Sequence, residues 1–186
     1  MSATAAPPKV PTRDRILFAA AELFRRQGYN GTGLKQVVAE AEAPFGSLYH
    51  HFPGGKQELA EEVVGKAGAF FQELVTAVYD SEATPEESVR AVFAGAAETL
   101  EATDYEDACP IETVALEVAS TDDRLRQATA AVFARWTDAL TERLADRAKA
   151  LAVIAALEGA FILCRASRST EPMLAAGEMA AAIVAD

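Results

Sequence analysis

The spacing of apolar residues predicts that the chain begins with an amphipathic helix. Four apolar residues recur at i, i+3, i+4 and i+7, which is the spacing of one helix face. They are Leu17, Ala20, Ala21 and Phe24. We predict a helix over residues 13–27, because Thr12 can cap its start and Gly28 directly follows its end.

Two shorter helices are predicted next, with a tight turn between them. Thr32 can cap the first, whose buried face consists of Leu34, Val37, Val38 and Ala41. Pro44 stops this helix, and another short helix is predicted over residues 45–52. Two short helices joined by a turn of three or four residues are typical of a helix-turn-helix.

The remainder of the chain also has helical periodicity. A long amphipathic helix is predicted from Lys56 to about Tyr79, and Thr84 and Pro85 have the residue types of a helix start. Further helices are predicted over residues 111–118, 123–144, 149–167 and 171–184; the break between the second and third of these depends on Asp146 alone.

The predicted fold class is therefore all-α. A disordered arm over residues 1–11 precedes a three-helix DNA-binding domain with a helix-turn-helix over residues 12–56. A bundle of about six helices over residues 57–186 is expected to serve ligand binding and dimerisation.

Charge distribution separates the two parts. The net charge of the chain is -11, but residues 1–68 contain eight basic and seven acidic side chains, so residues 69–186 carry a net charge of -12. This asymmetry fits a DNA-facing part joined to a solvated regulatory part, since DNA affinity depends on basic residues near phosphates.

Composition limits the location and the chemistry of the protein. Residues 1–11 lack the charged start and apolar run of a signal peptide, and the apolar run over residues 151–164 is interrupted by Glu158 and shorter than a membrane span. We therefore expect a cytoplasmic protein without a membrane partner. Cys109 and Cys164 have no spacing typical of a metal site, and we expect neither metal nor cofactor. They are interpreted as small buried hydrophobic residues, with redox sensing as the alternative.

One segment carries a specific resemblance. Residues 46–59 read Gly-Ser-Leu-Tyr-His-His-Phe-Pro-Gly-Gly-Lys-Gln-Glu-Leu, which closely resembles the recognition-helix signature of the TetR family of bacterial repressors. The segments 109–111 and 157–160, followed by Arg165-Ala166, are similar to the C-terminal domain of the LmrA/YxaF-type subgroup. The resemblance implies a ligand-responsive repressor that binds a palindromic double-stranded DNA operator as a homodimer and is released by a small lipophilic or aromatic effector.

Candidate DNA contacts follow from helix geometry and from this resemblance. Leu48 and Phe52 stand four residues apart and are expected to point inward, which leaves the other face of the helix for phosphates and base edges. The DNA-binding candidates are Thr32, Lys35, Pro44, Phe45, Gly46, Ser47, Tyr49, His50, His51 and Lys56.

Two residues depart from the family pattern. Glu42 stands in the turn where the family usually has glycine, so we expect a non-glycine residue at positive φ. Phe45 stands where a polar or basic residue is common; its ring can contact a thymine methyl group but cannot bind phosphate.

The regulatory part supplies candidate ligand and dimer contacts. An apolar lining with few polar groups is typical of a small-molecule site. The ligand-binding candidates are Phe93, Ala97, Leu100, Cys109, Ile111, Glu112, Val114, Phe133, Trp136 and Phe161. The last two helices are expected to pair with their two-fold mates, with Leu151, Ile154, Ala155, Gly159 and Ile162 as the interface candidates. Glu158 is expected to pair with Arg165 or Arg168.

Two other functional classes were weighed. An enzyme is not expected, because the sequence shows no nucleophile with a matched base, no phosphate loop and no metal triad. An all-helical dimeric adaptor without sequence-specific DNA binding remains the alternative, since Glu42 and the acidic balance oppose DNA.

Overall fold

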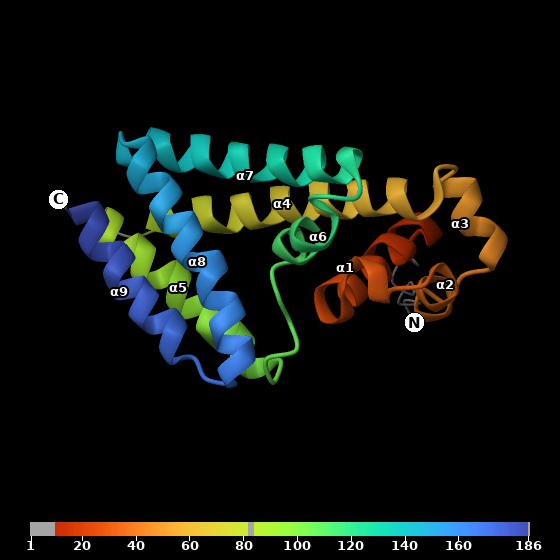
Figure 1. Cartoon of the computed structure of the whole chain (residues 1–186), viewed down its shortest axis with the longest axis horizontal. Coiled ribbons are helices and arrows are strands. Elements are labelled where there is room, and N and C mark those ends of the chain that lie inside the picture. Colours follow the sequence, from red (N-terminus) through yellow and green to blue (C-terminus); the bar gives the residue numbers. More distant parts are fainter. Residues whose placement is uncertain (1–9, 82–83, 186) are drawn as a thin grey trace, which may run out of the picture.

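The computed structural model describes residues 10–81 and 84–185, and these residues are almost entirely helical (Figure 1). The predicted arm over residues 1–11 lies mostly outside them. The helices in chain order are α1 (Thr12–Gly31), α2 (Leu34–Glu40), α3 (Phe45–His51), α4 (Gly55–Ser81), α5 (Pro85–Ala102), α6 (Pro110–Val118), α7 (Asp123–Leu144), α8 (Arg147–Ser167) and α9 (Glu171–Ala185). The all-α fold class predicted from the sequence is confirmed.

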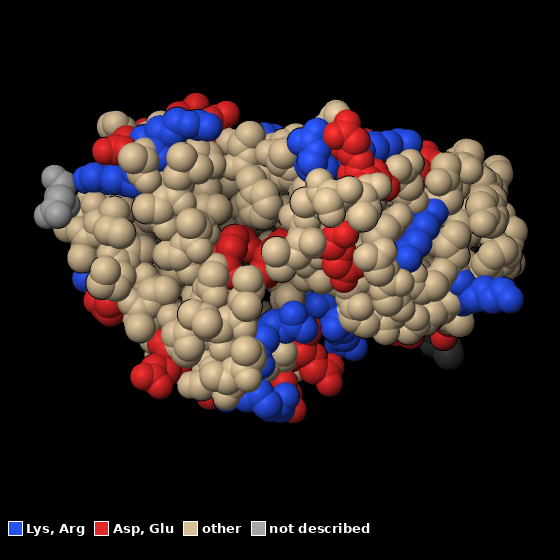
Figure 2. Space-filling model, in the orientation of Figure 1, with Lys and Arg blue, Asp and Glu red and all other residues tan. Residues whose placement is uncertain are grey.

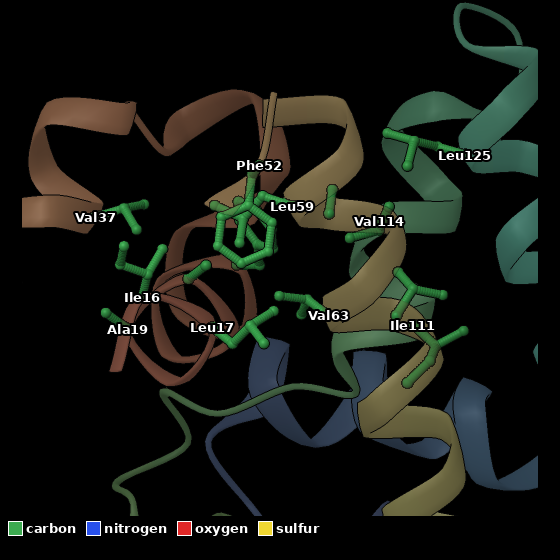
Figure 3. Close-up of a cluster of buried hydrophobic side chains, with 14 of the residues drawn as sticks. Ile16, Leu17, Ala19, Val37, Phe52, Leu59, Val63, Ile111, Val114 and Leu125 are labelled. Atoms are coloured by element: carbon green, nitrogen blue, oxygen red, sulfur yellow. The ribbon is translucent and has the colours of Figure 1, made fainter. Parts of the chain in front are cut away.

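Helices α1, α2 and α3 form a small module at one end of the molecule (Figure 1). The two seven-residue helices are too short to be stable alone in water, where roughly 12 residues are needed. Packing therefore holds them: Val37 of α2 and Leu48 of α3 are completely buried. Phe52, directly after α3, is also buried, and Figure 3 shows its ring beside Leu59 of α4.

Helices α4 and α7 lie side by side and connect the two ends of the molecule (Figure 1). They approach closely at Gly68, where an added Cβ would lie 2.5 Å from a methyl carbon of Val132. Trp136 of α7 fixes the same place, because its indole N–H donates to the Gly68 carbonyl oxygen at 2.8 Å. Helices α5, α8 and α9 pack together at the far end from the module.

The predicted helix positions agree well with the structure, and the differences lie at the caps. Thr12 is the first residue of α1 and Pro11 is its N-cap, while Gly33 rather than Thr32 is the N-cap of α2. The helical path of α1 breaks at Gly28, whose φ of 82° is open to glycine at little steric cost.

The break between α7 and α8 is where Asp146 predicted it. Ala145 takes a left-handed conformation with φ 54°, and the Asp146 carboxylate accepts hydrogen bonds from the backbone N–H groups of Ala148 and Lys149. Helix α8 consequently begins at Arg147, two residues earlier than predicted. Thr84 forms the predicted cap of α5, and its side chain and that of Glu87 make a reciprocal capping box.

Helix α8 is long and apolar enough, by length and composition alone, to cross a membrane, which the sequence analysis did not expect. One such helix is weak evidence for a membrane span, because the core helix of a soluble protein passes the same test. Here the face that holds Ala150, Val153 and Leu157 is buried against other helices of the chain.

Candidate DNA interface and ligand pocket

The turn between α2 and α3 has the strained residue that the sequence predicted. Glu42 has φ 47°, in the left-handed region that costs a non-glycine residue about 1 kcal/mol or more. Arg15 of α1 fixes this turn, since its guanidinium donates to the carbonyl oxygens of Ala41 at 2.8 Å and Glu42 at 3.1 Å. The sequence analysis assigned no role to Arg15, because a single arginine in an amphipathic helix carries no signal of its partner.

The outward face of α3 is aromatic and polar rather than basic. Phe45 and Tyr49 are 44% and 48% exposed and pack edge to face, with ring centroids 5.8 Å apart. His50 and Gly46 are exposed as well, and an added Cβ at Gly46 would meet nothing within 4 Å. Figure 2 accordingly shows mainly uncharged atoms over the α3 end of the molecule.

The remaining DNA-binding candidates differ in their accessibility. Lys35 and Pro44 are exposed, while Ser47 and His51 are partly buried. Thr32 is only 1% exposed, and its hydroxyl donates to the Gly28 carbonyl oxygen at 2.7 Å. Its side chain therefore closes the end of α1 instead of facing outward.

Lys56 lies at the start of α4 beside α1. Its ammonium group is 4.3 Å from the centroid of the Tyr29 ring, a distance typical of a cation–π contact. Partial burial there lowers the pKa of Lys56, and the nearby Glu117 carboxylate acts against this shift.

Several other basic groups near the module are occupied by carboxylates. Arg13 pairs with Glu62, and Arg25 pairs with the buried Asp107 at 2.9 Å. The basic side chains of the module thus serve partly to hold it against the rest of the chain, which reduces the charge available for phosphate.

Hydrogen bonds join the module to α6 and the start of α4 to the start of α7. The backbone N–H of Asn30 donates to Glu117 of α6 at 2.6 Å. Gln57, in the first turn of α4, donates to Asp122 at 2.8 Å. Figure 3 shows the apolar part of this junction, where Ile111 and Val114 of α6 lie close to Val63 of α4.

A pocket with a cavity volume of about 60 Å³ lies between α4, α5, α7 and α8. Its walls are mainly apolar, as is typical of small-molecule sites. Apolar side chains form most of the lining: Phe71, Val75, Val89, Val92, Phe93, Trp136, Ala139, Leu140, Val153, Ile154 and Leu157. The polar lining residues are Gln72, Thr76, Tyr79 and Arg143. Within the lining, the Phe71 and Trp136 rings pack with centroids 4.7 Å apart.

The structure places two of the ten ligand candidates, Phe93 and Trp136, in this lining. The others lie outside it: Ala97 and Leu100 are buried in α5, Cys109, Ile111, Glu112 and Val114 are buried at α6, and Phe133 and Phe161 are partly buried. The sequence analysis missed the α4 wall, although Gln72, Val75, Thr76 and Tyr79 have the i, i+3, i+4, i+7 spacing of one helix face.

Two carboxyl groups near α6 lack hydrogen-bond partners. Glu112 is 7% exposed, and one oxygen each of Glu112 and Glu158 is buried without a partner. Burial raises the pKa of Glu112 to about 7, with Arg165 acting against it, and raises the pKa of Glu158 to about 8, with the charge of Glu112 adding to the shift. Burial also raises the pKa of the neighbouring Cys109 thiol, which disfavours the reactive thiolate.

The predicted partners of Glu158 are wrong. Arg165 donates instead to the carbonyl oxygens of Tyr105 and Glu106, and Arg168 pairs with Asp104 at 2.5 Å. Both arginines bind the segment that links α5 to α6. Glu158 Oε2 is therefore buried without a hydrogen-bond donor among the described residues.

The outer faces of α8 and α9 expose apolar side chains. Leu151 and Ile162 of α8 are 49% and 48% exposed, and Leu174 and Met179 of α9 are also exposed. Among the other dimer candidates Ala155 is exposed and Gly159 is partly exposed, with open space where its Cβ would lie. Ile154 differs, because it lines the pocket.

Comparison with known proteins assigns this architecture to a family. Residues 16–63 match the bacterial regulatory proteins of the tetR family, and residues 85–179 match the transcriptional regulator LmrA/YxaF-like C-terminal domain. The chain belongs to the TetR family of bacterial transcriptional regulators, with an LmrA/YxaF-like C-terminal domain. It is accordingly a DNA-binding regulator of the repressor type, and the resemblance seen in residues 46–59 is confirmed.

Relatives cover most of the chain. The HTH-type transcriptional regulator LmrA of Bacillus subtilis is 32% identical over 171 residues, which cover 88% of this chain and 91% of that protein. An uncharacterized HTH-type transcriptional regulator of Mycobacterium tuberculosis is 37% identical over 174 residues, which cover 87% of this chain and 88% of that protein. In fold, the chain is similar to a regulatory protein TetR from Rhodobacter sphaeroides, with a TM-score of 0.84 at 18% identity over 92% of this chain and 97% of that one.

The two unpartnered carboxyl groups predict a pH-dependent stability. Since both keep their protons to higher pH when folded than when unfolded, the folded state binds more protons between about pH 4.5 and about pH 8, and stability falls as the pH rises across this range. Glu158→Gln removes one of these titrations, so we expect its Tm to fall less than that of the original chain between about pH 5 and about pH 8. Thermal melts followed by circular dichroism measure this, with Glu101→Gln on the exposed face of α5 as the control. Identical pH profiles for Glu158→Gln and the original chain would contradict the assignment.

Proposed function

We propose that this regulator binds a palindromic operator as a homodimer and that a small lipophilic or aromatic effector releases it. The observation that carries the proposal is the position of the apolar pocket against the far half of α4, the helix whose first turn holds Lys56 over the Tyr29 ring of the DNA-binding module. Its site of action would be the cytoplasm, where the DNA is.

Helix α4 provides the coupling between the two sites. Its 27 residues span about 40 Å, from Gly55 beside α3 to Ser81 beyond the pocket. An effector that favours a slightly tilted α4 changes the separation of the two recognition helices in a dimer. The effector then weakens operator binding. By thermodynamic linkage, the operator weakens effector binding by the same factor.

The exposed apolar residues of α8 and α9 support dimerisation through these helices. Leu151, Ala155, Gly159 and Ile162 lie on one side of α8, and a contiguous apolar surface of this kind marks a protein interface. Pairing of α8 and α9 with their two-fold mates gives a four-helix interface, and the operator then has the same two-fold symmetry as the protein.

On the DNA side, we propose that α3 reads base edges while the two lysines contact phosphate. Phe45, Ser47 and Tyr49 are placed for the major groove, with the phenyl ring suited to a thymine methyl group. Lys35 and Lys56 lie on either side of α3 in the sequence and supply charge without base preference.

The phosphate assignment predicts a uniform loss of affinity in Lys56→Ala. We expect binding to weaken for specific and non-specific DNA alike, and the slope of log affinity against log salt to fall by about one for each protomer. Mobility-shift assays over a series of salt concentrations measure both the affinity and its salt dependence. The operator for these assays is first selected from random duplexes. Lys66→Ala is the matched control, because Lys66 lies about 15 Å further along α4 and pairs with Asp14 at 3.7 Å. An unchanged salt slope in Lys56→Ala would show that Lys56 does not contact phosphate.

Dimerisation through α8 predicts that Ile162→Glu is monomeric. The two-fold axis duplicates the new charge, so each interface has to bury two carboxylates. We expect sedimentation velocity to show a monomer and operator affinity to fall with it. Leu116→Glu is the control, since Leu116 is 69% exposed on α6, away from this surface. An intact Ile162→Glu dimer would rule out this interface.

If the pocket binds the effector, a larger side chain in its lining should weaken ligand binding without changing DNA binding in the absence of ligand. Ala139 lines the pocket, so Ala139→Leu should weaken aromatic ligands about tenfold or more while ligand-free operator binding stays unchanged. Ala134→Leu, on the exposed face of the same helix, should bind both normally. Quenching of Trp136 emission reports the ligand, and mobility shift reports the operator. If every saturable ligand of this pocket leaves operator affinity unchanged, the effector part of the proposal is wrong.

A further inference from the structure

One residue of the pocket lining has a buried polar atom without a hydrogen-bond partner among the described residues. Among the described residues, four buried side-chain atoms lack a hydrogen-bond partner: Arg25 Nε, Tyr79 Oη, Glu112 Oε1 and Glu158 Oε2. Tyr79 is the one of these four residues that belongs to the pocket lining. A buried hydroxyl without a partner has lost its hydration without compensation, so a ligand that accepts its hydrogen bond recovers part of this cost.

The surroundings of Tyr79 determine what kind of group can satisfy it. The Arg143 guanidinium lies 5.3 Å from the centroid of the Tyr79 ring and pairs with Asp80 at 2.9 Å. Arg143 lines the pocket while its partner Asp80 does not, so the charged group on this part of the lining is a guanidinium, which favours an electron-rich oxygen over an ammonium group. Burial raises the pKa of Tyr79 to about 12, with Arg143 acting against the shift, so the hydroxyl keeps its proton at neutral pH and can donate it.

The opposite part of the pocket suits an aromatic body. The Phe71 and Trp136 rings and the Phe93 side chain form its walls, and Trp136 has its own polar atom occupied by the Gly68 carbonyl. These walls offer stacking and dispersion contacts but no free donor. Gln72 and Thr76 are the other polar residues of the lining, and the Tyr79–Arg143 end differs from them because it combines a buried hydroxyl with a charge.

We propose that the pocket takes a neutral or anionic aromatic ligand with a hydrogen-bond acceptor at one end, and that the Tyr79 hydroxyl donates to this acceptor. The inference rests on the proposed effector pocket and adds the chemistry and the orientation of its ligand. A buried donor in a mainly apolar cavity selects among ligands of similar shape, because the analogue that lacks the acceptor leaves the hydroxyl unpaired. Tyr79 is thus a specificity-determining residue of the site.

Two isosteric compounds test the proposal on the full-length protein without DNA. 2-Acetylnaphthalene carries a carbonyl acceptor, and 2-isopropenylnaphthalene has a methylene group in its place. We expect titration calorimetry to show the ketone binding about three- to tenfold more tightly, the range for one net hydrogen bond. In Tyr79→Phe the ratio should fall to about one while the alkene binds as before, which shows that the pocket is intact.

A matched control and a third compound complete the test. Tyr105→Phe makes the same chemical change at a tyrosine that also lies under an arginine but outside the pocket, and it should keep the preference for the ketone. The cation 1-(2-naphthyl)ethylammonium should bind more weakly than the ketone. Equal affinity for ketone and alkene, a preference that survives Tyr79→Phe, or tighter binding of the ammonium would each overturn the proposal. So would the absence of binding by all three compounds.

These outcomes are separate from those that test effector function. If the ketone binds through Tyr79 but leaves the operator complex intact, the chemistry of the pocket holds and the release mechanism fails for this ligand. If the ketone releases the operator equally well from Tyr79→Phe and from the original chain, the release mechanism holds and the role of Tyr79 is wrong.

Discussion

The packing of α1 against α4 and α6 is the constraint on which the rest of the structure depends. The helix-turn-helix does not have a separate hydrophobic core. Ile16 and Phe24 of α1 belong to one buried cluster that continues through Leu59 of α4 and Val114 of α6 to Trp136 of α7. Because interiors of this kind are close-packed, a displacement of α4 or α6 has to move α1 and the helices that rest on it. The regulatory half and the DNA-binding half are therefore mechanically one body at their junction.

A second consequence of this arrangement concerns electrostatics. Arg13 and Arg25 are committed to Glu62 and Asp107, and Arg15 is committed to the turn carbonyls. The module therefore uses much of its positive charge to fix its own position, and its outward helix presents aromatic rings instead. In the DNA complex that we propose, specific contacts of Phe45 and Tyr49 would then carry more of the recognition than general attraction to phosphate.

Much of this fold could be predicted from the sequence because its signals are local. The helical spacing of Leu17 and Phe24, the stop at Pro44 and the cap at Asp146 each depend on residues within one or two turns. The strained conformation of Glu42 could also be predicted, since the family turn usually has glycine at this place. The inward direction of Leu48 and Phe52 followed from their spacing of four, and both are fully buried.

The pocket was harder to predict because it depends on how four helices meet. Phe93 and Trp136 were expected as members of an apolar lining. Tyr79 and Arg143 lie near the ends of different helices, so their proximity depends on the tertiary packing of α4 and α7. The unpaired state of Glu158 is similar: Arg165 was an available partner by sequence and is drawn to the carbonyls of Tyr105 and Glu106 by the path of the chain. Thr32 was likewise assigned to DNA on family resemblance, while its hydroxyl binds the backbone of Gly28.

The meeting of Gly28 and Glu117 limits how this protein can be recombined with its relatives. A Cβ at position 28 would lie 1.9 Å from a carboxylate oxygen of Glu117, the same side chain that accepts the N–H of Asn30. The two positions, one on each side of the boundary between the halves, therefore form a matched pair. A side chain at position 28 would displace the Glu117 carboxylate from Asn30, so a chimeric repressor built by exchanging DNA-reading domains keeps this contact only where the grafted domain also has glycine at position 28.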